Sequence, residues 1–191
     1  MPYHHGDLRR ALLDRALEAI AEHGPAAVSL RDVARRAGVS HAAPTHHFRD
    51  KTALLTALAA EGWSQLADAL RDAAAEGREF GELGVAYVVF ATSHPAHFAV
   101  MRAPGLARAD DPELQAAMGR ARTQLEWGVQ RFEAGSGRDA RTTALAAWSL
   151  VHGLAALILE GAVLLEPDTD VAALARSVTA RLRPGGSPFE G

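Results

Sequence analysis

Hydrophobic residues along this chain recur at intervals of three and four positions, which is the spacing of one face of an α-helix. The first such run covers residues 7–23 and stops at Gly24-Pro25, a pair that interrupts helices. Similar runs follow through almost the whole chain, so the pattern predicts an all-α fold of about nine helices. The further expected helices cover residues 50–75, 80–93, 95–103, 112–134, 139–165 and 168–182, and the one at 95–103 is short. Asp50 and Asp111 are the expected caps of the helices at 50–75 and 112–134, and Gly135 to Gly137 end the helix at 112–134. His94 is expected to extend the face of the helix at 80–93.

Two short helices are expected between residues 29 and 47. Ser29 can cap the first of them, and Gly38 can adopt the left-handed conformation that closes it. Ser40 can cap a second short helix over residues 41–47, with Pro44 in its first turn. Two short helices joined by a glycine-containing turn, after a longer supporting helix, form a helix-turn-helix domain. The second helix of such a domain lies in the major groove of DNA.

The charges are unevenly distributed along the chain. Residues 1–51 carry eight Lys or Arg against six Asp or Glu, a net charge of +2, whereas residues 52–191 carry twelve against seventeen, a net charge of −5. Six of the nine histidines also lie in the first segment, where a nearby polyanion would favour their protonated form. A basic segment on an acidic body is typical of a protein whose basic part meets nucleic acid. An ordinary solvated surface explains the same distribution equally well.

The composition excludes several classes of protein. The chain has no cysteine, so disulfides, thiolate metal sites and a cysteine nucleophile are impossible. The longest apolar stretch, residues 150–165, is interrupted by His152 and Glu160 and is short for a membrane span. The N-terminal sequence has no apolar signal core, so we expect a cytoplasmic protein without membrane contact.

Two pairs of adjacent histidines raise the question of a metal site. They are His4 with His5 and His46 with His47, and neighbouring residues do not share a helix face. Zinc ligands on a helix are typically four residues apart, with a third ligand from elsewhere, and the sequence has no such set. We therefore expect no metal and no cofactor. His46 and His47 are interpreted as DNA contacts, and His4 and His5 as exposed side chains.

Three segments carry a family resemblance. They are LLDRALEAIAEHG at residues 12–24, VSLRDVARRAGVS at 28–40 and HHFRDKTALL at 46–55. Together they resemble the DNA-binding domain of the TetR family of transcriptional regulators in order and spacing, which is more specific than any short motif. The resemblance implies a homodimer on a palindromic operator in double-stranded DNA, and a helical C-terminal domain that dimerises and binds a small-molecule effector. The DNA-contact positions that it implies are Ser29, Arg31, Ser40, His41, Ala42, Ala43, Thr45, His46, His47 and Lys51.

Position 45 departs from the family pattern. Where the family commonly has a tyrosine that contacts the DNA backbone, this chain has Thr45, whose hydroxyl has a shorter reach. Backbone contacts fix position rather than sequence, so we expect DNA binding to persist. The alternative is a TetR-like protein with weakened DNA binding that acts through protein contacts. We assign base edges to His41, Ala43 and His46, and phosphates to Ser29, Thr45, His47 and Lys51.

A shorter resemblance lies in the C-terminal part of the chain. Residues 148–153, WSLVHG, resemble the Trp-His-Gly motif of one group of TetR C-terminal domains. The last two expected helices are candidates for a four-helix dimer interface. His152 is either a core histidine bonded to a nearby carbonyl or an effector contact. The candidate interface residues are Trp148, Val151, Ala155, Leu159, Val171, Leu174 and Val178.

An effector cavity is expected among the middle helices. Its candidate residues are mostly aromatic, and aromatic residues and methionine at helical spacing also form ordinary core, so both interpretations stand. As a cavity the set would be mostly apolar, which favours a small apolar or aromatic effector over a phosphate or a sugar. The candidates are Tyr87, Phe90, His94, His97, Phe98, Met101, Trp127, Trp148 and His152.

These features predict a helix-turn-helix domain at 1–50, an effector-binding and dimerisation domain at 51–183 and a disordered tail at 184–191. The long helix at 50–75 would belong to both domains and would couple effector binding to the spacing of the two DNA-binding domains. The resemblance implies a ligand-responsive regulator, most often a repressor released by its effector. A helical enzyme is the rival class, but the sequence shows no nucleophile elbow, phosphate-binding glycine loop or paired carboxylates.

Overall fold

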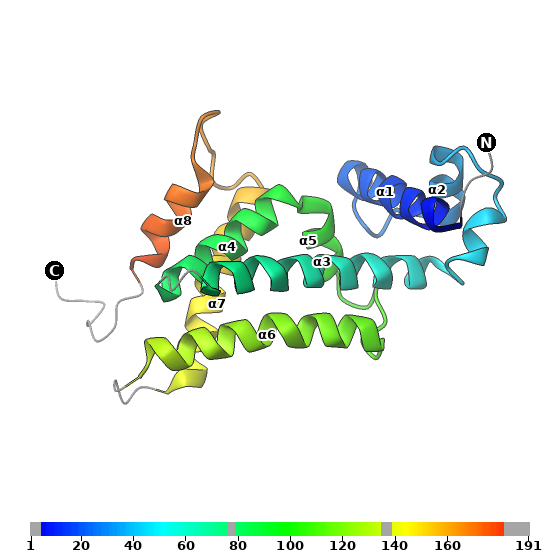
Figure 1. The fold of residues 1–191 in the computed structure, drawn as a ribbon. Coiled ribbons are helices and arrows are strands. Elements are labelled where there is room, and N and C mark those ends of the chain that lie inside the picture. Colours follow the sequence, from blue (N-terminus) through cyan, green and yellow to red (C-terminus); the bar gives the residue numbers. More distant parts are fainter. Residues whose placement is uncertain (1–4, 76–78, 135–138, 182–191) are drawn as a thin grey trace. The chain divides into compact units, whose positions relative to one another are not determined.

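The computed structural model describes residues 5–75, 79–134 and 139–181. Within these ranges the chain forms eight α-helices and one 3-10 helix, without a strand (Figure 1). The prediction of an all-α fold is therefore confirmed. The bounds are α1 His5–His23, α2 Leu30–Arg36, the 3-10 helix η1 Ala43–His46, α3 Lys51–Ala75, α4 Phe80–Ser93, α5 Pro95–Arg102, α6 Pro112–Phe132, α7 Ala140–Leu159 and α8 Val171–Thr179.

The helices group into two compact units. Of the described residues, those within 5–63 and 94–118 form the first unit, and those within 64–93 and 119–181 form the second. Helices α3 and α6 each contribute residues to both units. Helix α5 and the start of α6 therefore pack with the helix-turn-helix segment, although they lie far from it along the chain. The predicted boundary after residue 50 does not coincide with these units and stays a prediction about function.

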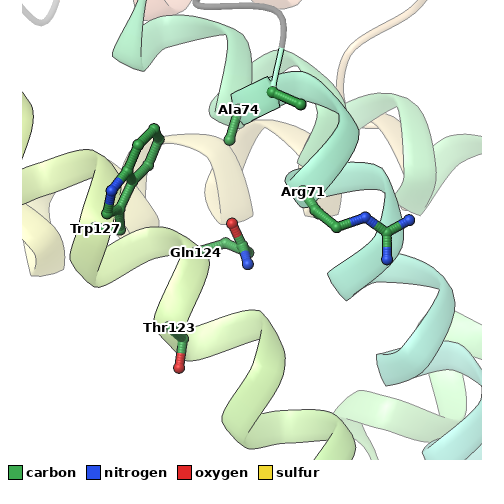
Figure 2. Close-up of a pocket in the computed structure, with 6 residues that line it drawn as sticks. Arg71, Ala74, Thr123, Gln124 and Trp127 are labelled. Carbon is green, nitrogen blue, oxygen red and sulfur yellow. The ribbon is translucent and has the colours of Figure 1, made fainter.

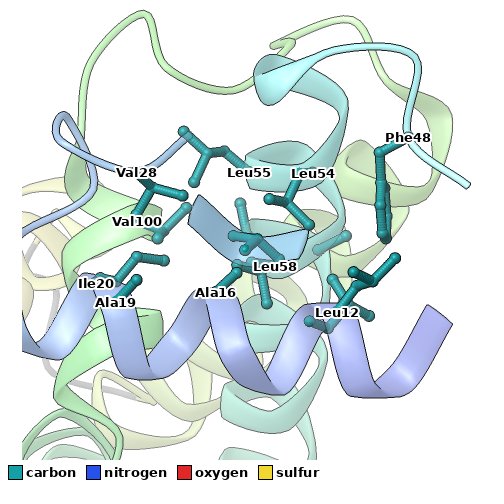
Figure 3. Close-up of a cluster of buried hydrophobic side chains, with 14 of the residues drawn as sticks. Leu12, Ala16, Ala19, Ile20, Val28, Phe48, Leu54, Leu55, Leu58 and Val100 are labelled. Atoms are coloured by element: carbon teal, nitrogen blue, oxygen red, sulfur yellow. The ribbon is translucent and has the colours of Figure 1, made fainter. Parts of the chain in front are cut away.

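A continuous apolar core holds the first unit together (Figure 3). Leu12 of α1 and Leu54 and Leu58 of α3 are completely buried in it. Val100 of α5 packs into the same cluster and is 1% exposed. Because full burial of such a side chain contributes about 1.5–3 kcal/mol, this cluster binds α5 firmly to α1 and α3.

Helix α4 is central to the second unit, where it packs against α7 and α8. Gly84 makes this approach possible, because an added Cβ atom there would lie 2.7 Å from Thr179 Cγ2 and 2.8 Å from Val151 Cγ1. Gly128 of α6 allows a similar approach to Leu83 of α4. The helices of the second unit therefore meet α4 at positions without a side chain, and larger residues there would force them apart.

The predicted helix boundaries are confirmed where a local signal sets them. Helices α3 and α4 match the predictions of 50–75 and 80–93 to within one residue. The expected cap of α6 is present, because Asp111 Oδ1 accepts a hydrogen bond from the amide of Leu114 at 3.0 Å. His94 does not continue α4 as predicted but lies at the N-cap position of α5, where it is exposed.

Two boundaries near the C-terminus are wrong. Helix α7 ends at Leu159 rather than at residue 165, because Gly161 takes a φ of 70° and turns the chain out of the helix. Helix α8 begins at Val171 because Asp170, not Asp168, accepts the capping hydrogen bond from the amide of Ala173. The predicted stop at Gly135–Gly137 and the tail at 184–191 lie outside the described residues.

Candidate functional site

Arg36 ties α2 to α1 in the first unit. Its two terminal nitrogens donate to Glu22 at 2.9 and 2.6 Å, and its Nε donates to Asp32 Oδ2 at 2.7 Å. These hydrogen bonds hold the pKa of Glu22 and the pKa of Asp32 below their ordinary values and raise the pKa of Arg36. Because bidentate pairing fixes geometry as well as adding energy, the network sets the orientation of α2 on α1.

The start and end of α2 follow the predicted signals. Ser29 Oγ accepts a hydrogen bond from the amide of Asp32 at 3.2 Å, which confirms the cap. That bond uses an oxygen lone pair, so the Ser29 hydroxyl can still donate its proton to a phosphate. Gly38 takes a φ of 67°, and the amide of Val39 then reaches the carbonyl of Ala34 at 3.0 Å. The turn between the two helical elements is therefore closed as the sequence predicts.

The recognition segment, residues 41–47, is not the α-helix that we predicted. It contains only the 3-10 helix η1, which has Ala42 at its N-cap and no capping side chain, so Ser40 does not cap it. Pro44 explains the difference, because proline lacks an N–H and disfavours the α conformation of the residue before it. Pro44 itself is fully buried, and its carbonyl accepts the amide of Phe48 at 2.8 Å.

The predicted DNA-contact residues differ in how accessible they are. Thr45 is exposed, but its hydroxyl already donates to the carbonyl of Ala42 at 2.7 Å. A hydrogen bond from Thr45 to a phosphate would require this bond to break, and the phosphate role of Thr45 stays a prediction. Ala43 and His47 are half-buried. The remaining exposed members of the set are Ser29, Arg31, Ser40, His41, Ala42 and His46.

The start of α3 adjoins the recognition segment. Asp50 Oδ1 accepts the amide of Ala53 at 2.7 Å, which confirms the predicted cap. This amide, followed by the nearby arginines Arg49 and Arg108, holds the pKa of the Asp50 carboxyl below its usual range. The half-buried Lys51 donates from Nζ to the carbonyl of Ala26 at 2.5 Å. Its ammonium group thus fastens the α1–α2 loop and keeps further donors for a phosphate.

Sequence reasoning missed two arginines of the first unit. The exposed Arg9 of α1 lies with its Cζ 5.4 Å from the ring centre of Phe48, which places a positive charge next to the recognition segment. Arg108, in the loop between α5 and α6, donates to Asp50 Oδ2 at 2.7 Å. Neither contact has a sequence signature, because each joins residues distant in the chain.

A buried histidine joins α5 to α3 and α1. His97 of α5 is 6% exposed, and its Nε2 lies 3.2 Å from Glu61 Oε1 of α3. The other carboxylate oxygen of Glu61 accepts a hydrogen bond from Arg10 of α1 at 2.7 Å. Burial lowers the pKa of His97, and the negative charge of Glu61 opposes this shift. His97 is therefore buried within the first unit, and its place in an effector cavity stays a prediction.

The nine predicted cavity residues fall into both units. His94, His97, Phe98 and Met101 belong to the first, and the other five to the second. In the second unit Tyr87 Oη lies 2.6 Å from His152 Nδ1, and the His152 ring lies 5.5 Å from that of Trp148. A tyrosine hydroxyl is therefore one polar partner of His152, and the choice between a core histidine and an effector contact stays open.

The second unit also contains a hollow of about 330 Å³ between α3 and α6. Figure 2 shows the lining residues on their helices, Arg71 and Ala74 on α3 and Thr123, Gln124 and Trp127 on α6. Trp127 is the only predicted cavity residue among those that line this hollow. The Cζ atom of Arg131 lies 4.7 Å from the centre of the Trp127 ring. The complete lining is Arg71, Ala74, Ala75, Thr123, Gln124 and Trp127.

Helix α7 exposes much of its apolar surface. It has a mean hydropathy of 1.7 over its most apolar window, yet only 17% of that window is buried. It is long and apolar enough to cross a membrane, but a single helix of this length and composition is weak evidence for a membrane protein. Large apolar patches on a chain surface typically mark an interaction site. Leu145, Trp148, Leu157 and Leu159 are the large apolar side chains that α7 leaves exposed.

The predicted dimer-interface residues divide between the inside and the outside of the second unit. Val151 and Ala155 are 6% and 0% exposed, so they pack within the chain and do not lie on the outer face of α7. Trp148 and Leu159 are 46% and 37% exposed. The three residues of α8 are half-buried: Val171, Leu174 and Val178.

These elements define a helix-turn-helix protein of the DNA-binding class, joined to a second helical unit. The sequence matches the family model for bacterial regulatory proteins of the tetR family over residues 12–58. It also matches the model for the tetracyclin repressor-like C-terminal domain over residues 80–182, which is more than half of the chain. The chain therefore belongs to the TetR family of transcriptional regulators.

Individual relatives agree with this assignment. The HTH-type transcriptional regulator BetI of Escherichia coli is 48% identical over 62 residues, a stretch that spans 32% of this chain and 32% of BetI. A solved structure of a protein of unknown function from Rhodococcus sp. RHA1 is 37% identical, with a TM-score of 0.74 and coverage of 95% of this chain and 97% of that one. A TetR family transcription regulator from Marinobacter aquaeolei VT8 is 22% identical, with a TM-score of 0.66 and coverage of 90% and 92%. At that identity the likeness shows the fold alone.

The comparisons confirm the family, the fold class and the role of transcriptional regulator that the sequence predicted. Membership gives the chain a regulatory role rather than one defined by catalysis. The Trp-His-Gly group, the individual site residues and the predicted absence of enzymatic activity stay predictions.

Proposed function

We propose that this chain is a ligand-responsive transcriptional repressor that binds a palindromic operator as a homodimer in the cytoplasm. The observation that carries the proposal is the exposed recognition segment in a firmly packed first unit. Most of its side chains are exposed, whereas Pro44 within it and Phe48 directly after it are buried. A small apolar effector releases the repressor from DNA.

The roles at the DNA surface follow from exposure and hydrogen-bonding capacity. His41 and His46 are exposed and read base edges in the major groove. Ser29 and Lys51, with donors to spare, contact phosphates, as does His47. Thr45, whose proton is engaged by Ala42, contributes little to phosphate binding. Phosphate contacts give affinity and salt dependence, while the two histidines give sequence preference.

The homodimer rests on the exposed apolar face of α7. Leu145, Trp148 and Leu159 stand at helical spacing on that face, and Leu145 is 58% exposed. A second copy of the chain that supplies the same face would bury them around a two-fold axis. Two recognition segments would then meet operator half-sites one helical turn apart, at about 34–36 Å.

The effector is proposed to bind in the second unit. Two features are candidates: the Tyr87–His152 pair beside Trp148, and the hollow between α3 and α6 that Trp127 lines. An effector that favours a dimer with a different spacing of its recognition segments lowers operator affinity. A compound that raises the melting temperature of the protein but leaves operator affinity unchanged would contradict this coupling.

Binding to DNA is the experiment that tests the proposal. The probes are the duplex that flanks the protein's own gene and duplexes selected from a random library. Binding to each probe is measured by fluorescence anisotropy at two salt concentrations. We expect binding tighter than to an unrelated duplex by about a thousandfold or more, weakened by salt. Weak binding that is equal on every duplex would contradict a sequence-specific regulator.

Two variants separate the proposed roles. His46→Ala should change the selected sequence, whereas Lys51→Ala should lower affinity for all sequences and reduce the salt slope by about one. If both variants act alike on every duplex, the division into base and phosphate contacts is wrong.

The engaged hydroxyl of Thr45 favours a second candidate, a TetR-family protein with weakened DNA binding that acts through protein contacts. Thr45→Tyr tests it. A large gain in affinity for the selected duplex would support this candidate, and unchanged affinity would favour the repressor.

A further inference from the structure

The loop between α5 and α6 is fastened to the start of α3. Arg108 in this loop makes two contacts with α3 and the residue before it. Its guanidinium donates to Asp50 Oδ2 at 2.7 Å, and its backbone N–H donates to Thr56 Oγ1 at 2.9 Å. Thr56 is 4% exposed, and its hydroxyl donates a hydrogen bond to the carbonyl of Thr52 at 2.7 Å. The loop is therefore held at the first and second turns of α3.

Asp50 has two functions at this place. One carboxylate oxygen caps α3 by accepting a hydrogen bond from the amide of Ala53, and the other accepts a hydrogen bond from Arg108. The next residue, Lys51, donates to Ala26 in the α1–α2 loop. Three segments of the first unit thus meet at the start of α3: the end of the recognition segment, the α1–α2 loop and the α5–α6 loop.

We propose that Arg108 is a positioning residue for DNA binding, which fixes the start of α3 and with it Lys51 and the recognition segment. The inference rests on the proposed function. Arg108 lies outside residues 12–58, which match the DNA-binding family model, and inside residues 80–182, which match the C-terminal model. A residue of the C-terminal sequence therefore controls the geometry of the DNA-binding surface.

A double-substitution cycle tests this role on the full-length protein. Arg108→Ala removes the side-chain contact and keeps the backbone one. Asp50→Asn removes the charge and keeps the capping oxygen, because asparagine caps helices as well as aspartate does. Operator affinity is measured for the wild type, the two single variants and the double variant, at two salt concentrations and well below the melting temperature of each. Arg120→Ala is the control, because it changes the net charge equally but bonds to Ser64 in the second unit.

We expect Arg108→Ala to weaken operator binding by about three- to fivefold, the range of a partly exposed ion pair, with an unchanged salt slope. In the Asp50→Asn background the same substitution should cost less than about twofold, since the pair is already broken. Arg120→Ala should bind the operator like the wild type.

Three results would overturn the inference. Wild-type affinity for Arg108→Ala would make the contact merely structural. An equal loss in both backgrounds would show that Arg108 acts without Asp50. A salt slope reduced by about one, without coupling, would make Arg108 a direct phosphate contact. A wild-type protein that binds no selected duplex would instead refute the proposed function, and this inference with it.

Discussion

The two units of this chain differ in how far they bury their apolar helices. In the first unit α1 and α3 bury their large apolar residues within the chain, and Leu12, Leu54 and Leu58 have no exposed surface. In the second unit α7 is at least as apolar, yet Leu145 is 58% exposed and Trp148 46%. The first unit buries its large apolar residues within one chain, whereas the second leaves an exposed apolar face on α7, where we propose that a second copy binds.

This difference has a consequence for function. A surface that reads DNA must keep its contact groups at fixed positions, and a closed core with polar ties such as Arg36–Glu22 provides that. If the exposed apolar face of α7 is the dimer interface, as we propose, the stability of the second unit should depend on protein concentration. Four experiments test this comparison.

The largest effect is expected from Leu58→Ala. Removal of a fully buried leucine from the first unit should lower the free energy of unfolding by about 2–5 kcal/mol and abolish operator binding at moderate temperature. Leu145→Ala is the matched control, because it makes the same chemical change on the exposed face of α7 and should cost under about 0.5 kcal/mol in the monomer. Urea denaturation measures both, and equal losses would remove the contrast between the units.

The next effect concerns association. Joint substitution of Leu145→Glu and Trp148→Glu places two charges on the apolar face of α7. We expect the dimer dissociation constant to rise by about 30-fold or more, because central aromatic residues dominate interface energies. Sedimentation at several protein concentrations measures it. An unchanged dimer would show that the face of α7 that holds these residues is not the interface.

A glycine pair gives an intermediate effect within the second unit. Gly84→Ala should destabilise the chain by about 1–3 kcal/mol, because the new methyl group meets Val151 and Thr179. Gly153→Ala in α7 meets nothing within 4 Å in the chain and should stabilise the helix by about 0.5–1 kcal/mol. Thermal unfolding of the two variants compares them. If Gly153→Ala instead weakens the dimer, the partner approaches α7 at that position.

The smallest effect is the acid response of the first unit. Glu22 and Asp32 have lowered pKa values, chiefly through the hydrogen bonds of Arg36. Their contribution to stability is therefore fully present above the unfolded pKa values of about 3.9–4.3 and is lost as the pH falls through the lower folded values. The melting temperatures of the wild type and of Arg36→Ala should differ at pH 6 and converge below about pH 4. If the difference in melting temperature between the two proteins stays constant down to pH 2.5, the Arg36 hydrogen bonds are not the cause of the acid response.

Elements with local signals could be predicted from the sequence. Ser29, Asp50 and Asp111 cap the helices assigned to them, since a cap needs only the residue and the next two or three amides. Pro44 is also a local signal for the 3-10 form of the recognition segment, and Gly161 is one for the end of α7. Helical periodicity continues past both residues, so it predicts an α-helix where the structure has none.

Other features depend on packing that periodicity does not report. Helix α7 is apolar on several sides, so the pattern identified a stripe through Val151 and Ala155 without showing that this stripe faces inward. The contact of Arg108 with Asp50 joins residues 58 positions apart, and the burial of His97 depends on α5 joining the first unit. None of these is encoded in a short stretch of sequence.

The alternation of burial in residues 41–48 has an evolutionary consequence. Pro44 and Phe48 anchor the stretch, while His41 and His46 stand on the surface, outside the core cluster. The buried anchors and the histidines that we propose to read base edges therefore occupy different, interleaved positions. If the two histidines read the operator as we propose, mutations at them retarget the regulator to a new promoter after gene duplication, or in a designed genetic circuit, while the scaffold that presents them is inherited unchanged.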